Sequence, residues 1–144
     1  MVPDIEIQHL SVCFDTAQGP VYAVNDLSTT FRAGRISGVI GESGSGKSVT
    51  SLSIMGLLQH PGRVVDGEIF FQDQDILSYG KRRMRRVRGK EIAMIFQDPM
   101  TSLNPVYTVG NQIMEMLQEH EDIGKGEAKR RAIEMLRMVG IPSP

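Results

Sequence analysis

The sequence has a single cysteine, no long apolar run and almost no net charge, and each shortage excludes a class of protein. Cys13 has no partner for an internal disulfide, and one cysteine excludes a multi-cysteine zinc or iron–sulfur centre within the chain. No apolar run approaches the ~18 residues that span a bilayer, and Asp4 and Glu6 stand where a secretion signal would be basic and then apolar. A net charge of −1 argues against nucleic-acid binding by overall charge. We therefore expect a soluble cytoplasmic protein, with peripheral membrane attachment left open.

The pattern of apolar residues predicts five strands. The 144 residues, of which 40% are hydrophobic, are enough for one domain with a core. Apolar and polar residues roughly alternate across residues 5–14 and 21–31, and residues 67–72 read as a further strand. Short apolar runs at residues 36–40 and 92–96 predict two strands buried on both faces.

Helical spacing of apolar residues predicts four helices. The first runs from Lys47 and stops at His60-Pro61-Gly62, and the second covers the basic stretch 79–88. Thr108 can cap a third helix, and a last one runs from about residue 126 to Gly140. Along the chain, the predicted order is antiparallel strands, then a strand–loop–helix and a buried strand, and finally helices. This order predicts an α/β nucleotide-binding core with a β N-terminal part and a helical attachment.

The stretch from Gly41 to Ser48 fits the pattern G-x-x-x-x-G-K-[ST], between a predicted strand and a predicted helix. Glycines let the backbone approach phosphates closely, and N–H groups at the helix N-terminus favour an anion. Lys47 would place a full charge on the β- and γ-phosphates of Mg-ATP, and the Ser48 hydroxyl would bind Mg²⁺. A chance Gly/Ser-rich turn is the alternative, and the flanking elements argue against it. The residues expected to contact the nucleotide are Gly41, Glu42, Ser43, Gly44, Ser45, Gly46, Lys47, Ser48 and Val49.

Two further sequence blocks narrow the choice of protein family to which the chain is similar. They are Arg88-Gly89-Lys90-Glu91-Ile92 and Ile95-Phe96-Gln97-Asp98-Pro99-Met100-Thr101-Ser102-Leu103-Asn104-Pro105. Together with the phosphate loop, these blocks show that essentially the whole chain resembles the N-terminal portion of ABC transporter ATPase subunits. More narrowly, it resembles the oligopeptide/dipeptide importer ATPases. The resemblance implies a P-loop NTPase core with an N-terminal antiparallel β subdomain across residues 1–99. It also implies the incomplete beginning of a helical subdomain across residues 100–144.

Gln97 is similar to the Q-loop glutamine of this family. By itself, a glutamine after a strand could simply cap the strand end. The resemblance implies instead that its side-chain oxygen binds Mg²⁺ and orients water near the γ-phosphate, so that Gln97 and Lys47 form the catalytic pair. Pro99 would fix the exit of this loop.

The resemblance also implies an aromatic ring that stacks on adenine, upstream of the phosphate loop. Phe14 is our choice, because it lies on the N-terminal β part, 33 residues before Lys47. Tyr22 is the alternative platform. A core aromatic on a strand, without contact to nucleotide, is the purely structural interpretation of Phe14.

The sequence ends at Pro144, before the family's signature motif, general base and switch histidine. We therefore expect this stretch to bind Mg-ATP but hardly to hydrolyse it alone. We also expect the strands at 36–40 and 92–96 to lack partners, so that the isolated chain is unstable, swapped or prone to aggregate. A truncated nucleotide-binding module without turnover is an alternative function.

The resemblance implies three protein partners. They are integral membrane permease subunits, a second ATPase subunit in a head-to-tail dimer and, indirectly, an extracytoplasmic solute-binding protein. The location would be the cytoplasmic face of the inner membrane. The basic run 81–90 could bind nucleic acid or anionic lipid, but a solvated helix is the simpler interpretation, and we expect no nucleic acid. A nucleic-acid-associated P-loop ATPase is the remaining alternative.

Overall fold

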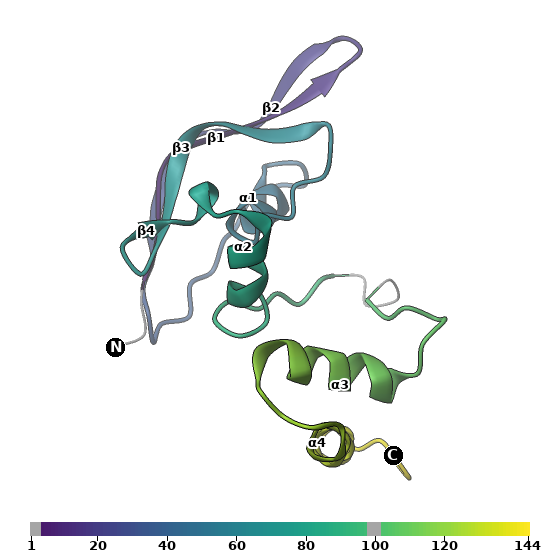
Figure 1. The fold of residues 1–144 in the computed structure, drawn as a ribbon. Coiled ribbons are helices and arrows are strands. Elements are labelled where there is room, and N and C mark those ends of the chain that lie inside the picture. The colour runs from purple at the N-terminus through teal and green to yellow at the C-terminus, as the bar shows by residue number, and fades with distance from the viewer. Residues whose placement is uncertain (1–3, 98–101) are drawn as a thin grey trace. The chain divides into compact units, whose positions relative to one another are not determined.

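The computed structural model in Figure 1 describes residues 4–97 and 102–144. It divides into two compact units, one up to Met84 and one from Arg85 onward. The first unit contains the sheet and helix α1, and the second contains helices α3 and α4. The short 3-10 helix η1 (Ile76–Ser78) and helix α2 (Lys81–Val87) lead from one unit to the other along the chain.

The first unit is built on a four-stranded antiparallel sheet. Its strands are β1 (Ile5–Thr16), β2 (Gly19–Phe31), β3 (Gly62–Phe71) and β4 (Gln74–Asp75), in the order β2-β1-β3-β4. The predicted strand is confirmed as the central strand β1, but its burial does not alternate, because residues 10–13 are all buried where the pairing with β2 and β3 shifts register. The most buried apolar side chains of β1 and β3 are Ile7, Leu10, Val12, Cys13 and Ile69. Burying such side chains drives the sheet to form.

Helix α1 (Lys47–Ile54) follows the phosphate loop and contacts β2. Its buried face carries two hydroxyls that bond within the helix, from Thr50 to the Gly46 carbonyl at 3.0 Å and from Ser53 to the Val49 carbonyl at 2.8 Å. The expected end at residues 60–62 was wrong. The helix already ends at Ile54, because Gly56 adopts φ 58° and its N–H donates to the carbonyl of Ser53. The N–H of Leu57 donates back to the carbonyl of Leu52.

The two apolar runs expected to be buried strands, 36–40 and 92–96, are neither strands nor buried. Ile36 and Ile40 are 104% and 98% exposed, and Ile95 is 98% exposed. Within the described residues, the only β-bridge of either segment joins Ile92 to Arg88. A parallel strand is stable only with hydrogen-bonded neighbours and covered faces, and no such neighbour lies in this part of the protein.

The second unit consists chiefly of α3 (Val109–His120) and α4 (Lys125–Met138), which pack on each other through Leu117, Ala128 and Ala132. The predicted cap is confirmed, because the Thr108 hydroxyl accepts a hydrogen bond from the Asn111 N–H at 3.2 Å. In the described part of the chain, no helix is long and apolar enough to cross a membrane.

Candidate phosphate-binding site

The loop before α1 depends on glycine at two positions. Gly44 and Gly46 have φ values of 83° and 86°, in the left-handed region that favours glycine. Gly46 is also packed tightly, since a Cβ there would lie 2.3 Å from the backbone oxygen of Ala23 and 3.1 Å from Val24 Cγ2 on β2. Gly46 therefore joins the loop closely to strand β2, and no other residue fits there without movement.

Lys47 points its ammonium group back over the loop. Its Nζ donates to the carbonyl oxygens of Gly41 at 2.8 Å and Glu42 at 2.6 Å, and to Ser45 Oγ at 3.3 Å. These acceptors carry no formal charge, and among the described residues no carboxylate forms an ion pair with this lysine. Within this part of the chain, the Lys47 ammonium is therefore not held in an ion pair, and an anion can bind it.

The N-terminus of α1 is open. Gly46 is its N-cap residue and supplies no side-chain hydrogen bond, so no capping side chain competes with a ligand for the first N–H groups of the helix. Ser48 is exposed, and within the described residues its hydroxyl has no hydrogen-bond partner. A phosphate fits this set of N–H donors and a cation, and a Mg²⁺ held mainly by phosphate oxygens and water fits the single hydroxyl. No group of three or more potential metal-ligating side chains occurs in the described ranges.

The other predicted site residues lie elsewhere. Gln97 belongs to the second unit, is exposed and follows the irregular segment that the sequence predicts as a strand. Pro99, expected to fix the loop's exit, lies outside the described residues. The phosphate loop belongs to the first unit.

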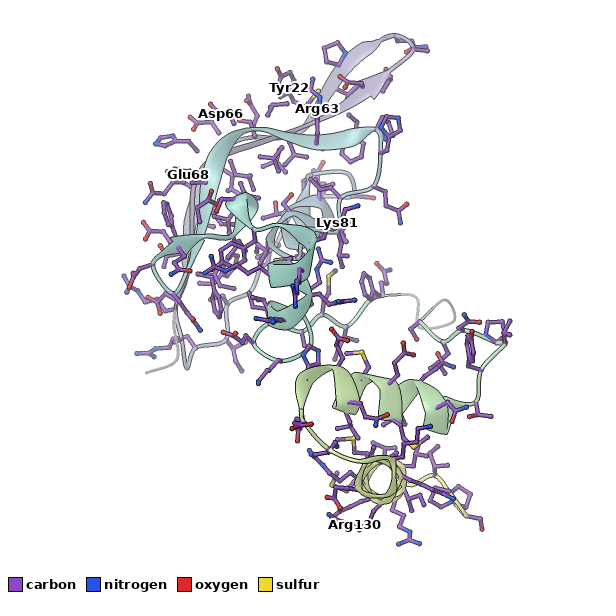
Figure 2. All side chains as sticks on the ribbon, viewed as in Figure 1. Tyr22, Arg63, Asp66, Glu68, Lys81 and Arg130 are labelled. Carbon is purple, nitrogen blue, oxygen red and sulfur yellow. The ribbon has the colours of Figure 1, made fainter. Side chains whose placement is uncertain are left out.

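Phe14 lies in the first unit, near the end of β1, and its side chain is half-buried. Tyr22 of β2 is 56% exposed. Tyr22 and Arg63 of β3, both labelled in Figure 2, are the register partners of Cys13 on either side of β1. The Asp15 carboxylate accepts hydrogen bonds from Arg63 Nε at 3.0 Å and Nη2 at 3.3 Å. The hydrogen bond from Arg63 holds the pKa of Asp15 below its ordinary value.

Two residues of this site were not found from the sequence. Ala23 contributes the backbone oxygen against Gly46, and Gly62 lies under the ring of Phe14. Both contacts join residues far apart in the chain, and neither residue type signals such a role. The short distances from these glycines are visible only in the folded structure.

The comparison with protein families defines the class. The family model described as "ABC transporter" matches residues 24–143, so the chain belongs to the ABC transporter family. The dipeptide transport ATP-binding protein DppD of Haemophilus influenzae is 49% identical over 140 residues, which are 97% of this chain and 42% of that protein. The oligopeptide transport ATP-binding protein OppD of Bacillus subtilis is 49% identical over 141 residues, or 97% and 39% of the two chains. The chain thus spans about two fifths of the length of these curated relatives.

Solved structures agree on the fold. A dimeric post-hydrolysis state of the ATP-binding cassette MJ0796, bound to ADP and Pi, has a TM-score of 0.76 at 20% identity. The match covers 93% of this chain and 56% of that one. The expected fold class, an ABC ATPase core with an antiparallel β part and the start of a helical part, is therefore confirmed.

Proposed function

We propose that this chain binds the phosphates of Mg-ATP through residues 41–48, as part of the ATP-binding subunit of an importer for peptides or a related solute. The observation that carries the proposal is the loop itself. It combines an uncapped helix N-terminus with the Lys47 ammonium, which is held only by neutral acceptors.

Each loop residue has a role that follows from its position. Lys47 would exchange its bonds to the Gly41 and Glu42 carbonyls for β- and γ-phosphate oxygens, which are stronger acceptors because they carry negative charge. The backbone N–H groups from Ser43 to Val49 would donate to the remaining phosphate oxygens. The Ser48 hydroxyl would bind Mg²⁺, which would neutralise charge between the phosphates.

Three further assignments belong to the same proposal. Gln97 would contribute a side-chain oxygen to the Mg²⁺ and position water near the γ-phosphate. Phe14 would stack on adenine, with Tyr22 as the alternative. We place the domain division of the protein after residue 99, where the helical subdomain would begin.

We propose the partners on the basis of the relatives, which are named as subunits for dipeptide and oligopeptide transport. The protein would dock on membrane permease subunits at the cytoplasmic face of the inner membrane. It would pair with a second ATPase subunit head-to-tail, and would serve an extracytoplasmic solute-binding protein indirectly. The dimeric neighbour structures support the pairing.

The test is titration of the protein with Mg-ATP by calorimetry, in parallel with two lysine variants. Lys47→Ala should weaken binding by about 10-fold or more, because a charge-assisted bond to phosphate contributes on the order of 1.5–3 kcal/mol. Lys125→Ala, at the start of α4, is the matched control and should bind like the wild type. Undiminished binding by Lys47→Ala would refute the assignment of the loop.

A further inference from the structure

The ring of Phe14 rests on a residue that has no side chain. Phe14 pairs with Gly62 across β1 and β3, and with Val21 across β1 and β2. Side chains of directly paired residues share one face of a sheet. A Cβ at Gly62 would lie 2.6 Å from Phe14 Cε1 and 2.8 Å from Cζ. The outer edge of the ring therefore lies directly over the Gly62 backbone.

We propose that Gly62 is a positioning residue for the adenine platform, because its missing side chain lets the Phe14 ring lie where a base can stack on it. This inference rests on the proposed function. Carbon atoms in contact are about 3.5–4.0 Å apart, so any side chain at Gly62 would push the outer edge of the ring by about 1 Å or more. The half-buried ring has room to move on its exposed side, so the change would displace the platform and leave the sheet intact.

The backbone around this pair is held firmly, so the ring has to move rather than the strands. Asp15 follows Phe14 and Arg63 follows Gly62, and their two hydrogen bonds, at 3.0 and 3.3 Å, cross from β1 to β3. The Asp15 N–H also bonds the Pro61 carbonyl at 3.4 Å, and the Gly62 N–H bonds the Gln59 carbonyl at 2.8 Å. Alanine at position 62 is therefore accommodated chiefly by rotation of the Phe14 side chain, since its Cβ would also lie 3.1 Å from the Gln59 carbonyl oxygen, which needs to shift by only a few tenths of an ångström.

The alternative is purely structural, because an aromatic ring that covers a glycine on a neighbouring strand can stabilise a sheet. The two roles differ in what they predict for ligands. If Gly62 only stabilises the sheet, its replacement lowers the free energy of unfolding and changes the affinity for all phosphate ligands equally. A positioning role affects only ligands that carry a base.

The experiment compares Mg-ATP with inorganic Mg-tripolyphosphate, which offers the phosphates without a base. Stacking of one base on an aromatic ring contributes roughly 5- to 150-fold in affinity. Gly62→Ala should weaken Mg-ATP about threefold or more and leave tripolyphosphate unchanged. Phe14→Ala should do the same, and adding Gly62→Ala to it should cause no further loss. The matched control is Gly80→Ala, where a Cβ would meet nothing within 4 Å.

Three outcomes would overturn the inference. They are unchanged ATP affinity in Gly62→Ala, an equal loss for tripolyphosphate, and a further loss of ATP affinity when Gly62→Ala is added to Phe14→Ala. Failure of the proposed function looks different, because Lys47→Ala would then bind tripolyphosphate as well as the wild type does.

A spectroscopic readout tests the platform first without the glycine variant and then with it. The sequence contains no tryptophan, so F14W introduces a single indole at the platform. Mg-ATP should quench its fluorescence and tripolyphosphate should not, and Gly62→Ala in this background should reduce the quenching. If Mg-ATP leaves the indole fluorescence unchanged and Tyr22→Ala loses ATP affinity, the platform is Tyr22 and the inference is overturned.

Discussion

Replacing the two left-handed glycines of the phosphate loop by alanine separates backbone strain from packing. Gly44→Ala and Gly46→Ala both force an alanine into the left-handed region, at φ 83° and φ 86°. That conformation costs an L-residue roughly 1–2 kcal/mol. Only at Gly46 would the new Cβ also collide with a backbone oxygen, 2.3 Å away on Ala23, whereas at Gly44 it would meet nothing within 4 Å.

The expected magnitudes follow from these contacts. Gly44→Ala should lower the free energy of unfolding of the first unit by about 1–2 kcal/mol. Gly46→Ala adds a clash with a backbone group that cannot rotate away, and overpacking costs typically 1–3 kcal/mol. Its total should be roughly 2–5 kcal/mol, a large share of the stability of a small unit.

Urea unfolding followed by tyrosine fluorescence measures this difference. The chain has three tyrosines and no tryptophan, so a Tyr107→Phe background leaves Tyr22 and Tyr79 as reporters of the first unit. With an m-value of about 1.5 kcal/mol/M, the midpoints of the two alanine variants should differ by roughly 0.7–2 M. Equal midpoints would refute the close packing of Gly46 on β2.

Three further predictions concern other parts of the chain. The hydrogen bond from Arg63 lowers the pKa of Asp15, so this pair stabilises the fold fully above pH 3.8, the ordinary pKa of an aspartate, and less as the pH falls below that value. Asp15→Asn should therefore be less stable than the wild type at pH 7, and acid unfolding curves should show this difference in stability disappearing at low pH. Thr108→Ala should destabilise α3 by about 0.5–2 kcal/mol, seen as faster amide exchange at the helix start, and Thr108→Ser should restore protection. Ile36→Thr and Ile40→Thr should change the stability of the chain by less than about 0.5 kcal/mol, since both side chains are exposed; a loss above 2 kcal/mol in thermal unfolding would mean that this segment is buried.

Local signals predicted much of the fold and singled out the candidate phosphate loop. The rough alternation of apolar residues identified β1 and β2, although the burial itself does not alternate: residues 10–13 of β1 are all buried, and Val24 is the buried residue of β2. The Thr108 cap and the loop from Gly41 to Ser48 were also found, since each depends on residues a few positions apart. Such features are set by the chain's own geometry, whatever surrounds them.

The predictions that failed depended on partners or on competing local signals. The runs at 36–40 and 92–96 read as buried strands, yet burial requires neighbours that hydrophobicity cannot reveal. The end of α1 was misplaced because apolar residues continue in helical spacing to Leu57, while Gly56 already turns the backbone out of the helix. The choice of Phe14 over Tyr22 stays a prediction, because it depends on tertiary contacts such as the one between Phe14 and Gly62.

The close approach of Gly46 to Ala23 bears on the distance between the two ends of the proposed nucleotide site. Val24, which Gly46 also meets, is the register partner of Val12 on β1, two residues before Phe14. The anchor of the phosphate loop and the ring of Phe14 therefore belong to one hydrogen-bonded pair of strands. Under the proposed function, the register of β1 and β2 would therefore set the distance between the base and the phosphates.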